Sequence, residues 1–504
     1  MKKSSDNEEK AGRNAQTSTR CAVVDIGSNS VRLVIFDGPA RAPMAICNEK
    51  ALCGLGRDMT EDGALNPLSV ADAIATLKRF RIILRAYGDP PTKTIATSAV
   101  REAKDGDAFV SAIRDLGFEA RVISGAEEAE LAALGVLSVE PNARGLAGDM
   151  GGGSLELVAI KKGGVAHGVS LPIGPLSLMR ATGGDIGKAT ELIKEALSAT
   201  DFIRQGGFDC LYSVGGAWRS IARIHMNLKH YPLSVLHHYE LPTESALEVC
   251  DLVARQSRRS LEEIPGISRK RIDTLPLAAI ALKSLLTEMN ASRMIVSAGG
   301  VREGLLYQSL SASRRKQDPL LEACRFFSHR FAPEPRFGAA AYSVVAALFD
   351  DDATVQRRIL EATSEIIDIA AFSHPDLRGR QAFDTALSAP FVGVTHKERV
   401  WIALALYCRY CGRNAPLPNE QAISLLDWDD QQSATRAGLA LRFVATLAPK
   451  SPGLLNGCSL LKADGAVIFK APPDHEALIG ETPRKRLDSL AAAFELPLRL
   501  DFDG

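Results

Sequence analysis

The stretch CAVVDIGSNSVRLVIF, residues 21–36, contains two apolar runs separated by a turn of Gly, Ser and Asn. This pattern predicts a β-hairpin whose tip carries an acid, Asp25, and several backbone N–H groups. The stretch LAGDMGGGSLELVAI, residues 146–160, repeats the pattern at a constant offset that places Asp149 on Asp25 and Ser154 on Ser30. An internal repeat of this kind indicates a duplicated structural unit.

The segments around the two copies alternate between helical and strand patterns. Helices are expected over about 67–87, 105–116 and 126–138, and strands over about 94–100 and 120–124. Two later segments each place a Gly-Gly pair, Gly215-Gly216 and Gly299-Gly300, between an apolar strand and a helix. Such turns let a backbone approach a ligand and present a helix N-terminus to an anion. The region is therefore expected to form two successive α/β domains.

Changes in composition along the chain predict four segments. Residues 1–20 contain no apolar core, so we expect a disordered tail and not a signal peptide. The α/β domains are expected over 21–140 and 141–311. Residues 312–504 are expected to form a mainly helical domain with a small α/β appendage at its end.

Composition excludes several classes of protein. Lys plus Arg and Asp plus Glu both number 60 in 504 residues, so bulk charge does not hold the protein on nucleic acid or anionic lipid. No apolar stretch approaches the roughly 20 residues that cross a bilayer, so we expect no membrane span. The nine cysteines are scattered, which suits a reducing cytoplasm better than a disulfide framework.

The hairpin tips carry the clearest chemical signal. Consecutive N–H groups in a Gly-rich tip form an anion-binding nest, and phosphate is the usual ligand. Two tips that face each other would hold a phosphate from both sides, and the Gly215-Gly216 turn offers a further phosphate contact. Carboxylates beside a phosphate repel it unless a cation intervenes, so Asp25 and Asp149 predict a Mg²⁺ ion.

Several charged residues each allow two interpretations. Arg101 either binds phosphate or pairs at the surface with Glu102 or Asp105. Glu127 and Glu128 open a helix, where acids favour the helix dipole, and either could also serve as a general base toward water. Glu156 is either solvent-facing or a third carboxylate near the metal. The basic run Arg314, Arg315, Lys316, Arg325, Arg330 and Arg336 either lines an anionic groove or forms a solvated face.

Four motifs together resemble a known family. DIGSNSVRL, ATSAVREA, ISGAEEAELAALGV and DMGGGSLEL, in this order and spacing, resemble the exopolyphosphatase / guanosine pentaphosphate phosphohydrolase family of the actin-like ATPase superfamily. The resemblance covers about 21–310. It implies two ribonuclease-H-like (actin-like) domains with a cleft between them, and a C-terminal helical domain related to HD phosphohydrolases.

The resemblance also implies roles for individual residues. Glu128 matches the catalytic base and Glu127 its companion. Asp149 and Glu156 match the acids around Mg²⁺, with Asp25 opposite. The positions that match phosphate-binding residues are Gly27, Ser28, Asn29, Ser30, Arg101, Gly151, Gly152, Gly153 and Ser154.

The C-terminal region departs from the family pattern. In EIIDIAAFSHPDLRG, Asp368 lacks the preceding His of an intact His-Asp pair, so no second metal-dependent site is expected. We expect this region to extend the substrate groove or to form a dimer contact, and the family resemblance implies a homodimer.

Four functions follow as alternatives. The first is exopolyphosphatase, the Mg²⁺-dependent release of orthophosphate from the end of polyphosphate. The second is hydrolysis of guanosine pentaphosphate (pppGpp) by the same chemistry. A long basic groove favours polyphosphate, whereas an aromatic or apolar guanine pocket favours the nucleotide. The third is a kinase of the same fold, and the fourth is a catalytically silent phosphate or nucleotide sensor.

Overall fold

The structure, a computed structural model, describes residues 20–57, 59–60, 62–161, 164–264 and 269–502. The predicted tail over 1–20 lies outside the described residues except for Arg20. The described chain forms two compact units. The first contains the residues up to Lys229 together with Tyr239–Gln317, and the second contains His230–His238 and the chain from Asp318 onward. The domain boundaries at 140 and 311 stay predictions.

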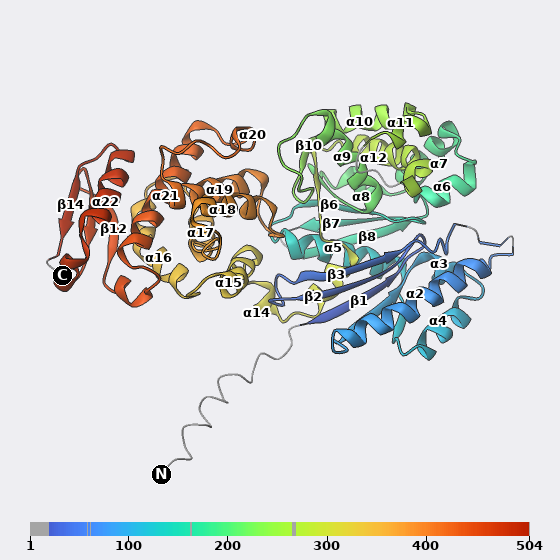
Figure 1. The fold of residues 1–504 in the computed structure, drawn as a ribbon. Helices are drawn as coiled ribbons and strands as arrows, with labels where there is room; N and C mark the ends of the chain where they lie inside the picture. Colours follow the sequence, from blue (N-terminus) through green and yellow to red (C-terminus); the bar gives the residue numbers. More distant parts are fainter. Residues whose placement is uncertain (1–19, 58, 61, 162–163, 265–268, 503–504) are drawn as a thin grey trace, which may run out of the picture. The chain divides into compact units, whose positions relative to one another are not determined.

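The first unit begins with a five-stranded sheet (Figure 1). Its strands are β1 (Cys21–Ile26), β2 (Val31–Asp37), β3 (Met44–Ala51), β4 (Thr92–Ala96) and β5 (Ala120–Val122), in the order β3-β2-β1-β4-β5. β1, β2 and β3 pair antiparallel, while β1, β4 and β5 pair parallel. Alternate residues such as Val24 and Leu33 pack in one core with Phe80 of α2 (Pro67–Ala86) and Ile113 of α4 (Gly106–Asp115).

A second sheet in the same unit repeats this order. Its strands are β6 (Gly145–Met150), β7 (Leu155–Lys161), β8 (Gly164–Leu171), β9 (Cys210–Val214), β10 (Glu240–Pro242) and β11 (Arg293–Val296). The order β8-β7-β6-β9-β11 matches β3-β2-β1-β4-β5, and β10 is added at the edge. This is the ribonuclease-H-like strand order, so the predicted pair of such folds is confirmed.

Further helices and one 3₁₀ turn lie between and after the strands of this sheet along the chain. They are α6 (Pro175–Thr182), α7 (Ile186–Ser198), α8 (Asp201–Gln205), α9 (Gly216–Leu228), α10 (Thr243–Arg255), α11 (Arg258–Glu262), the 3₁₀ turn η1 (Arg269–Thr274), α12 (Leu275–Met289), α13 (Val301–Gln308) and α14 (Ala312–Arg315). Within the described part of the chain, no helix has both the length and the apolar character that a membrane crossing requires.

Two helices, α5 (Gly125–Val139) and α13, lie between the two sheets (Figure 1). Their backbones approach so closely that only glycine fits at the crossing. A methyl group at Gly135 would overlap the carbonyl oxygen of Gly300, and one at Gly304 would overlap that of Leu131. This packing fixes the middle of α5, the helix whose first turn carries Glu128, against the first half of α13.

The repeated hairpins have the same local geometry. In the first copy the amide of Gly27 donates to the carbonyl oxygen of Ser30, and in the second the amide of Gly151 donates to that of Ser154, both at 3.0 Å. The repeat predicted from the sequence is therefore present at the level of individual hydrogen bonds.

The sequence prediction differs from the structure between 97 and 100. The expected strand over 94–100 ends at Ala96, and α3 (Ser98–Glu102) begins there instead. The partner strand β1 ends at Ile26, whose carbonyl accepts the amide of Thr97 at 3.1 Å, so a longer β4 would have no strand beside it. Arg101 therefore lies on a short helix.

The second unit is mainly helical, as predicted. Its helices are α15 (Pro319–Phe331), α16 (Phe337–Val345), η2 (Ala346–Phe349), α17 (Arg357–Glu365), η3 (Pro375–Leu377), α18 (Arg378–Ser388), α19 (His396–Cys411), α20 (Glu420–Ile423), α21 (Trp428–Leu447) and η4 (Pro452–Leu455). The appendage contains β12 (Ser459–Ala463), β13 (Ala466–Lys470), η5 (Pro473–Leu478), α22 (Glu481–Ala493) and β14 (Leu498–Asp501). The relation of the helical second unit to HD phosphohydrolases stays a prediction.

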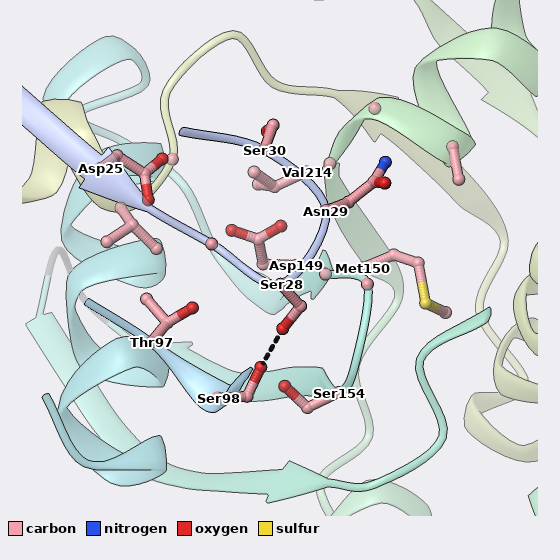
Figure 2. Close-up of a pocket in the computed structure, with 18 of the residues that line it drawn as sticks. Asp25, Ser28, Asn29, Ser30, Thr97, Ser98, Asp149, Met150, Ser154 and Val214 are labelled. Carbon is pink, nitrogen blue, oxygen red and sulfur yellow. Dashed lines mark hydrogen bonds between the residues drawn. The ribbon is translucent and has the colours of Figure 1, made fainter. Parts of the chain in front are cut away.

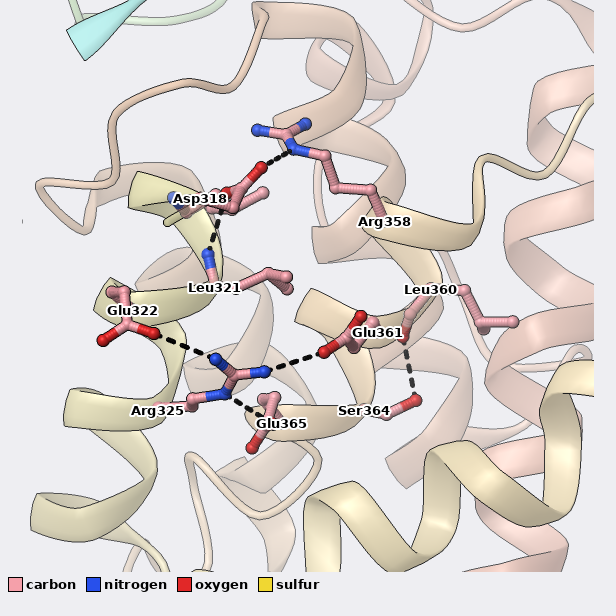
Figure 3. A network of polar contacts seen from close by, with 10 residues as sticks. Asp318, Leu321, Glu322, Arg325, Arg358, Leu360, Glu361, Ser364 and Glu365 are labelled. Carbon is pink, nitrogen blue, oxygen red and sulfur yellow. Dashed lines mark hydrogen bonds and ion pairs between the residues drawn. The ribbon is translucent and has the colours of Figure 1, made fainter. Parts of the chain in front are cut away.

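Two residues of the basic run, Arg325 and Arg336, form ion pairs, and so does Asp368. The guanidinium of Arg325 contacts Glu322, Glu361 and Glu365 at 2.9, 2.9 and 3.2 Å (Figure 3). Arg336 pairs with Glu334 at 2.9 Å. Both guanidinium groups are neutralised locally. Asp368, only 1% exposed, is held by Arg409 at 2.7 Å and Lys450 at 3.4 Å.

Candidate active site

A cavity of about 200 Å³ lies in the first unit and is lined by residues from both repeats (Figure 2). It brings together all four candidate carboxylates, Asp25, Glu128, Asp149 and Glu156. It also contains most of the residues expected to bind phosphate: Gly27, Ser28, Asn29, Ser30, Gly151, Gly152, Ser154, Gly215 and Gly216. The segments that the sequence singled out thus converge on one place.

Three predicted residues do not line the cavity. Arg101 lies directly behind Glu128 and contacts it. Gly153 faces α6, where its carbonyl oxygen accepts from Gly174 and Ser177. Glu127 lies apart from the site, because its carboxylate pairs with Arg121 at the surface.

The hairpin tips present unused backbone donors. Among the described residues, no hydrogen-bond acceptor is found for the amides of Ser28, Asn29, Gly152 and Gly153. Figure 2 shows the first tip held against α3, where the hydroxyl oxygens of Ser28 and Ser98 lie 2.7 Å apart. Free amides on a fixed tip form an anion-binding nest.

Glu128 lies in the first turn of α5 and is 8% exposed. Ser124 caps the helix by accepting the amide of Glu127 at 3.1 Å. Arg101 Nη1 lies 3.2 Å from Glu128 Oε2 and also donates to the carbonyl of Ile123 at 2.8 Å. Burial raises the pKa of Glu128 to about 7; Arg101 opposes the shift, while the neighbouring carboxylates reinforce it. A carboxylate with this pKa is suited to accept a proton at neutral pH.

The second sheet places two more carboxylates beside this glutamate. Asp149 and Glu156 are partners across β6 and β7, and Ser170 of β8 donates to Glu156 Oε1 at 2.8 Å. Burial raises the pKa of Asp149 to about 6, although the Arg219 and Arg302 guanidinium groups oppose the shift. Burial and then Glu128 raise the pKa of Glu156 well above its usual value. Glu128, Asp149 and Glu156 therefore form a group of buried carboxylates on one part of the cavity lining.

These carboxylates can supply one or two of the ligands of a Mg²⁺ ion, but they do not enclose the ion by themselves. No three His, Cys, Asp or Glu side chains among the described residues are placed to hold one metal ion. The predicted trio Asp25, Asp149 and Glu156 does not form such a group; Asp25 pairs with Arg302 at 2.9 Å, and Glu156 accepts from Ser170. Mg²⁺ commonly uses one or two carboxylates and takes its remaining ligands from water and phosphate.

The sequence analysis missed the cations of the site. Six basic residues line the cavity: Arg32, Lys50, Arg57, Arg219, Arg271 and Arg302. Arg32 lies in the DIGSNSVRL motif, and Arg219 and Arg302 follow the two Gly-Gly turns, but the sequence analysis assigned none of the six a role. One was detectable, because the repeat offset that aligns Asp25 with Asp149 also aligns Arg32 with Glu156, a site candidate.

Duplicated ribonuclease-H-like folds, anion-binding tips and a carboxylate of raised pKa together define a phosphate-handling enzyme. Residues 18–313 match the Ppx/GppA phosphatase family, and residues 340–497 match the family described as "Exopolyphosphatase, C-terminal". The chain belongs to the Ppx/GppA phosphatase family and is a phosphoanhydride hydrolase. The resemblance noted in the sequence is thereby confirmed.

The chain is also similar to named proteins and to solved structures. The chain is 28% identical to Retrograde regulation protein 2 of Saccharomyces cerevisiae, over 80% of this chain and 74% of the relative. It is 26% identical to Exopolyphosphatase 2 of Mycobacterium tuberculosis, over 54% and 91%. Among solved structures, an exopolyphosphatase from Cytophaga hutchinsonii superposes with a TM-score of 0.54 at 25% identity, covering 57% of this chain and 97% of that one.

Proposed function

We propose that the protein is an exopolyphosphatase that hydrolyses the terminal phosphoanhydride of polyphosphate with Mg²⁺. One observation carries the proposal: both hairpin tips and Glu128, a carboxylate with a pKa near 7, meet in one cavity. The tips supply donors for a phosphate, and the glutamate supplies a base for water. Named exopolyphosphatases among the relatives support the same substrate.

The roles follow from position. The amides of Ser28, Asn29 and Gly152 bind the terminal phosphate, and Glu128 orients and deprotonates a water. The water oxygen bonds to the terminal phosphorus, and the bridging P–O bond breaks with its electron pair on the bridging oxygen. The water proton passes to Glu128, and orthophosphate leaves the shortened chain. Arg101 keeps the carboxylate in place.

Asp149 would hold Mg²⁺, with Asp25 opposite it across the cavity. The ion would neutralise charge on the phosphate oxygens. Asp149 is suited to this role because it is a buried carboxylate whose raised pKa reflects incomplete compensation by its neighbours.

The lining of the cavity favours polyphosphate over a guanine nucleotide. None of the described residues that line it is aromatic, and six are basic. The apolar residues Met150, Pro175, Leu176, Val214 and Val301 also line the cavity, so the preference rests on the lack of an aromatic stacking partner among the described lining residues and on the cations that a phosphate chain requires. A homodimer in a reducing cytoplasm completes the proposal, supported by the family resemblance and by nine cysteines that form no disulfide within the described residues.

The test is orthophosphate release with Mg²⁺ from long-chain polyphosphate and from pppGpp at equal phosphate concentration. We expect a higher kcat/KM on polyphosphate. Release from pppGpp alone would transfer the assignment to the nucleotide phosphohydrolase. Release from neither substrate would contradict a hydrolase and would favour the kinase or the sensor alternative.

A further inference from the structure

Ser98 begins the short helix α3 and lies in the wall of the cavity. Its side chain is buried, and its Oγ lies 2.7 Å from the Oγ of Ser28 in the first hairpin tip (Figure 2). The same oxygen reaches the second tip, because a methyl group on Gly153 would lie 3.0 Å from it. One buried hydroxyl therefore lies against both hairpin tips.

Ser28 is held from a second side as well. Its carbonyl oxygen accepts the amide of Gly56 at 2.7 Å. The N–H of the same peptide group belongs to Asn29 and has no acceptor among the described residues. Because a trans peptide group is planar and its N–H and C=O point in opposite directions, fixing the carbonyl also fixes the direction of the N–H. The bond to Ser98 and the bond to Gly56 together set where this donor points.

The last turn of the same helix holds the general base. Arg101 follows Ser98 by three residues in α3, and its Nη1 lies 3.2 Å from Glu128 Oε2. The start of the helix is tied to the first sheet, because the amide of Thr97 donates to the carbonyl of Ile26 at 3.1 Å. A single turn of helix thus contacts the anion-binding tip through one side chain and the base through another.

We propose that Ser98 is a positioning residue that fixes the terminal phosphate relative to Glu128. The inference rests on the proposed function and adds to it a residue that no motif assigned. The tip amides bind the phosphate and Glu128 acts on the water, so the distance between them depends on α3, which contacts both. A misplacement of about 1 Å between reacting groups can lower a rate about 10²-fold without removing the contacts that bind the substrate.

The test compares turnover with binding. Ser98→Ala should lower kcat on long-chain polyphosphate at least tenfold. It should change the Kd for tripolyphosphate less than threefold, measured by calorimetry on full-length chains that also carry Glu128→Gln and do not turn over. Ser364→Ala is the matched control, because it removes a buried hydroxyl of α17 that donates to the carbonyl of Leu360 at 2.8 Å (Figure 3). The control should keep the kcat of the wild type.

A double-mutant cycle tests the hydroxyl pair itself. Ser28→Ala removes the same hydrogen bond from the other side, so it should lower kcat by a similar factor. The double variant should be no slower than either single variant, because all three lack one and the same bond. Thermal unfolding shows that each variant is folded, and Ser28→Ala carries the test if Ser98→Ala does not fold.

Three kinetic results would overturn the proposal. An unchanged kcat in Ser98→Ala would show that the bond does not position the phosphate. A weakened Kd with an unchanged kcat would make Ser98 a direct ligand of the phosphate instead. Losses that multiply in the double variant would show that the two hydroxyls act separately.

Hydrogen exchange separates this inference from the proposed function, because it requires no turnover. The amide of Gly27 closes the first tip on the carbonyl of Ser30, so the peptide that spans 21–36 reports the opening of the tip. Exchange at this peptide should be at least threefold faster in Ser98→Ala than in the wild type or in Ser364→Ala. Faster exchange would support the hold of Ser98 on the tip even if the wild type releases no orthophosphate. Equal exchange would refute it even if the wild type is an active exopolyphosphatase.

Discussion

Arg101 Nη1 lies 3.2 Å from Glu128 Oε2, and its charge and hydrogen bond lower the pKa of this glutamate against the effect of burial. The same nitrogen is anchored on the carbonyl of Ile123 at 2.8 Å. The pair therefore has a fixed geometry, in which burial raises the pKa of the base and Arg101 limits the rise.

This relationship predicts the pH profile. A general base must be deprotonated, so kcat/KM should rise about tenfold per pH unit below 7 and level off above it. Asp149, Asp25 and Glu156 also face Glu128 and favour its protonated form. Removing the cation in Arg101→Met should raise the pKa of Glu128 further and move the acidic limb to higher pH by about one unit.

Arg121→Met is the matched control for this shift, because Arg121 pairs with the neighbouring Glu127 at the surface. Its acidic limb should coincide with that of the wild type. A limb that stays in place in Arg101→Met would show that another group controls the profile.

Asp149 should determine the response to Mg²⁺. Chelation of divalent cations should abolish orthophosphate release by the wild type, and added Mg²⁺ should restore it. Mg²⁺ together with tripolyphosphate should raise the thermal midpoint of the wild type but not that of Asp149→Asn. Asp201→Asn, at an exposed position on α8, should respond as the wild type does. An unaltered Mg²⁺ response in Asp149→Asn would place the ion elsewhere.

The close contact between α5 and α13 predicts a stability change. Gly304→Ala should lower the free energy of unfolding by about 1–3 kcal/mol, because its methyl group would overlap the Leu131 carbonyl. Urea denaturation measures the change. Gly453→Ala is the control, since nothing lies within 4 Å of the added group. Equal stability of the two variants would contradict the packing of α5 on α13.

Asp368 should be important for the stability of the second unit. Asp368→Ala leaves Arg409 without its partner in a buried setting, a change that typically costs about 3–5 kcal/mol. Asp384→Ala removes an exposed pair with Arg380 and should cost less than about 1 kcal/mol. Thermal unfolding compares the two. A stable Asp368→Ala protein with an intact midpoint would show that the pair is dispensable.

Much of the fold could be predicted from the sequence because the duplication is local and periodic. The offset between Asp25 and Asp149 predicted two equivalent hairpins, and both have the same closing hydrogen bond. The strand predicted over 94–100 is too long at its C-terminal end, because its length depends on where the partner strand stops at Ile26. The end of a partner strand is a feature of the tertiary structure and is not visible in the local sequence.

The candidate site was predictable where a motif carries it and not where tertiary packing assembles it. The Gly-rich tips and Glu128 belong to contiguous motifs. Lys50 and Arg271 belong to separate elements and stand in none of the motifs, so only the fold shows that they share a cavity. Glu127 illustrates the reverse case, because adjacent residues of a helix point in different directions and only Glu128 lines the cavity.

The most direct test of the account compares Glu128→Gln with Glu130→Gln, an exposed position on the same helix. Orthophosphate release from long-chain polyphosphate is measured with Mg²⁺ at pH 8, together with the Kd for tripolyphosphate. We predict that Glu128→Gln lowers kcat by about 10²–10⁴-fold with little change in Kd, while Glu130→Gln matches the wild type. Retention of kcat in Glu128→Gln would contradict its assignment as the general base.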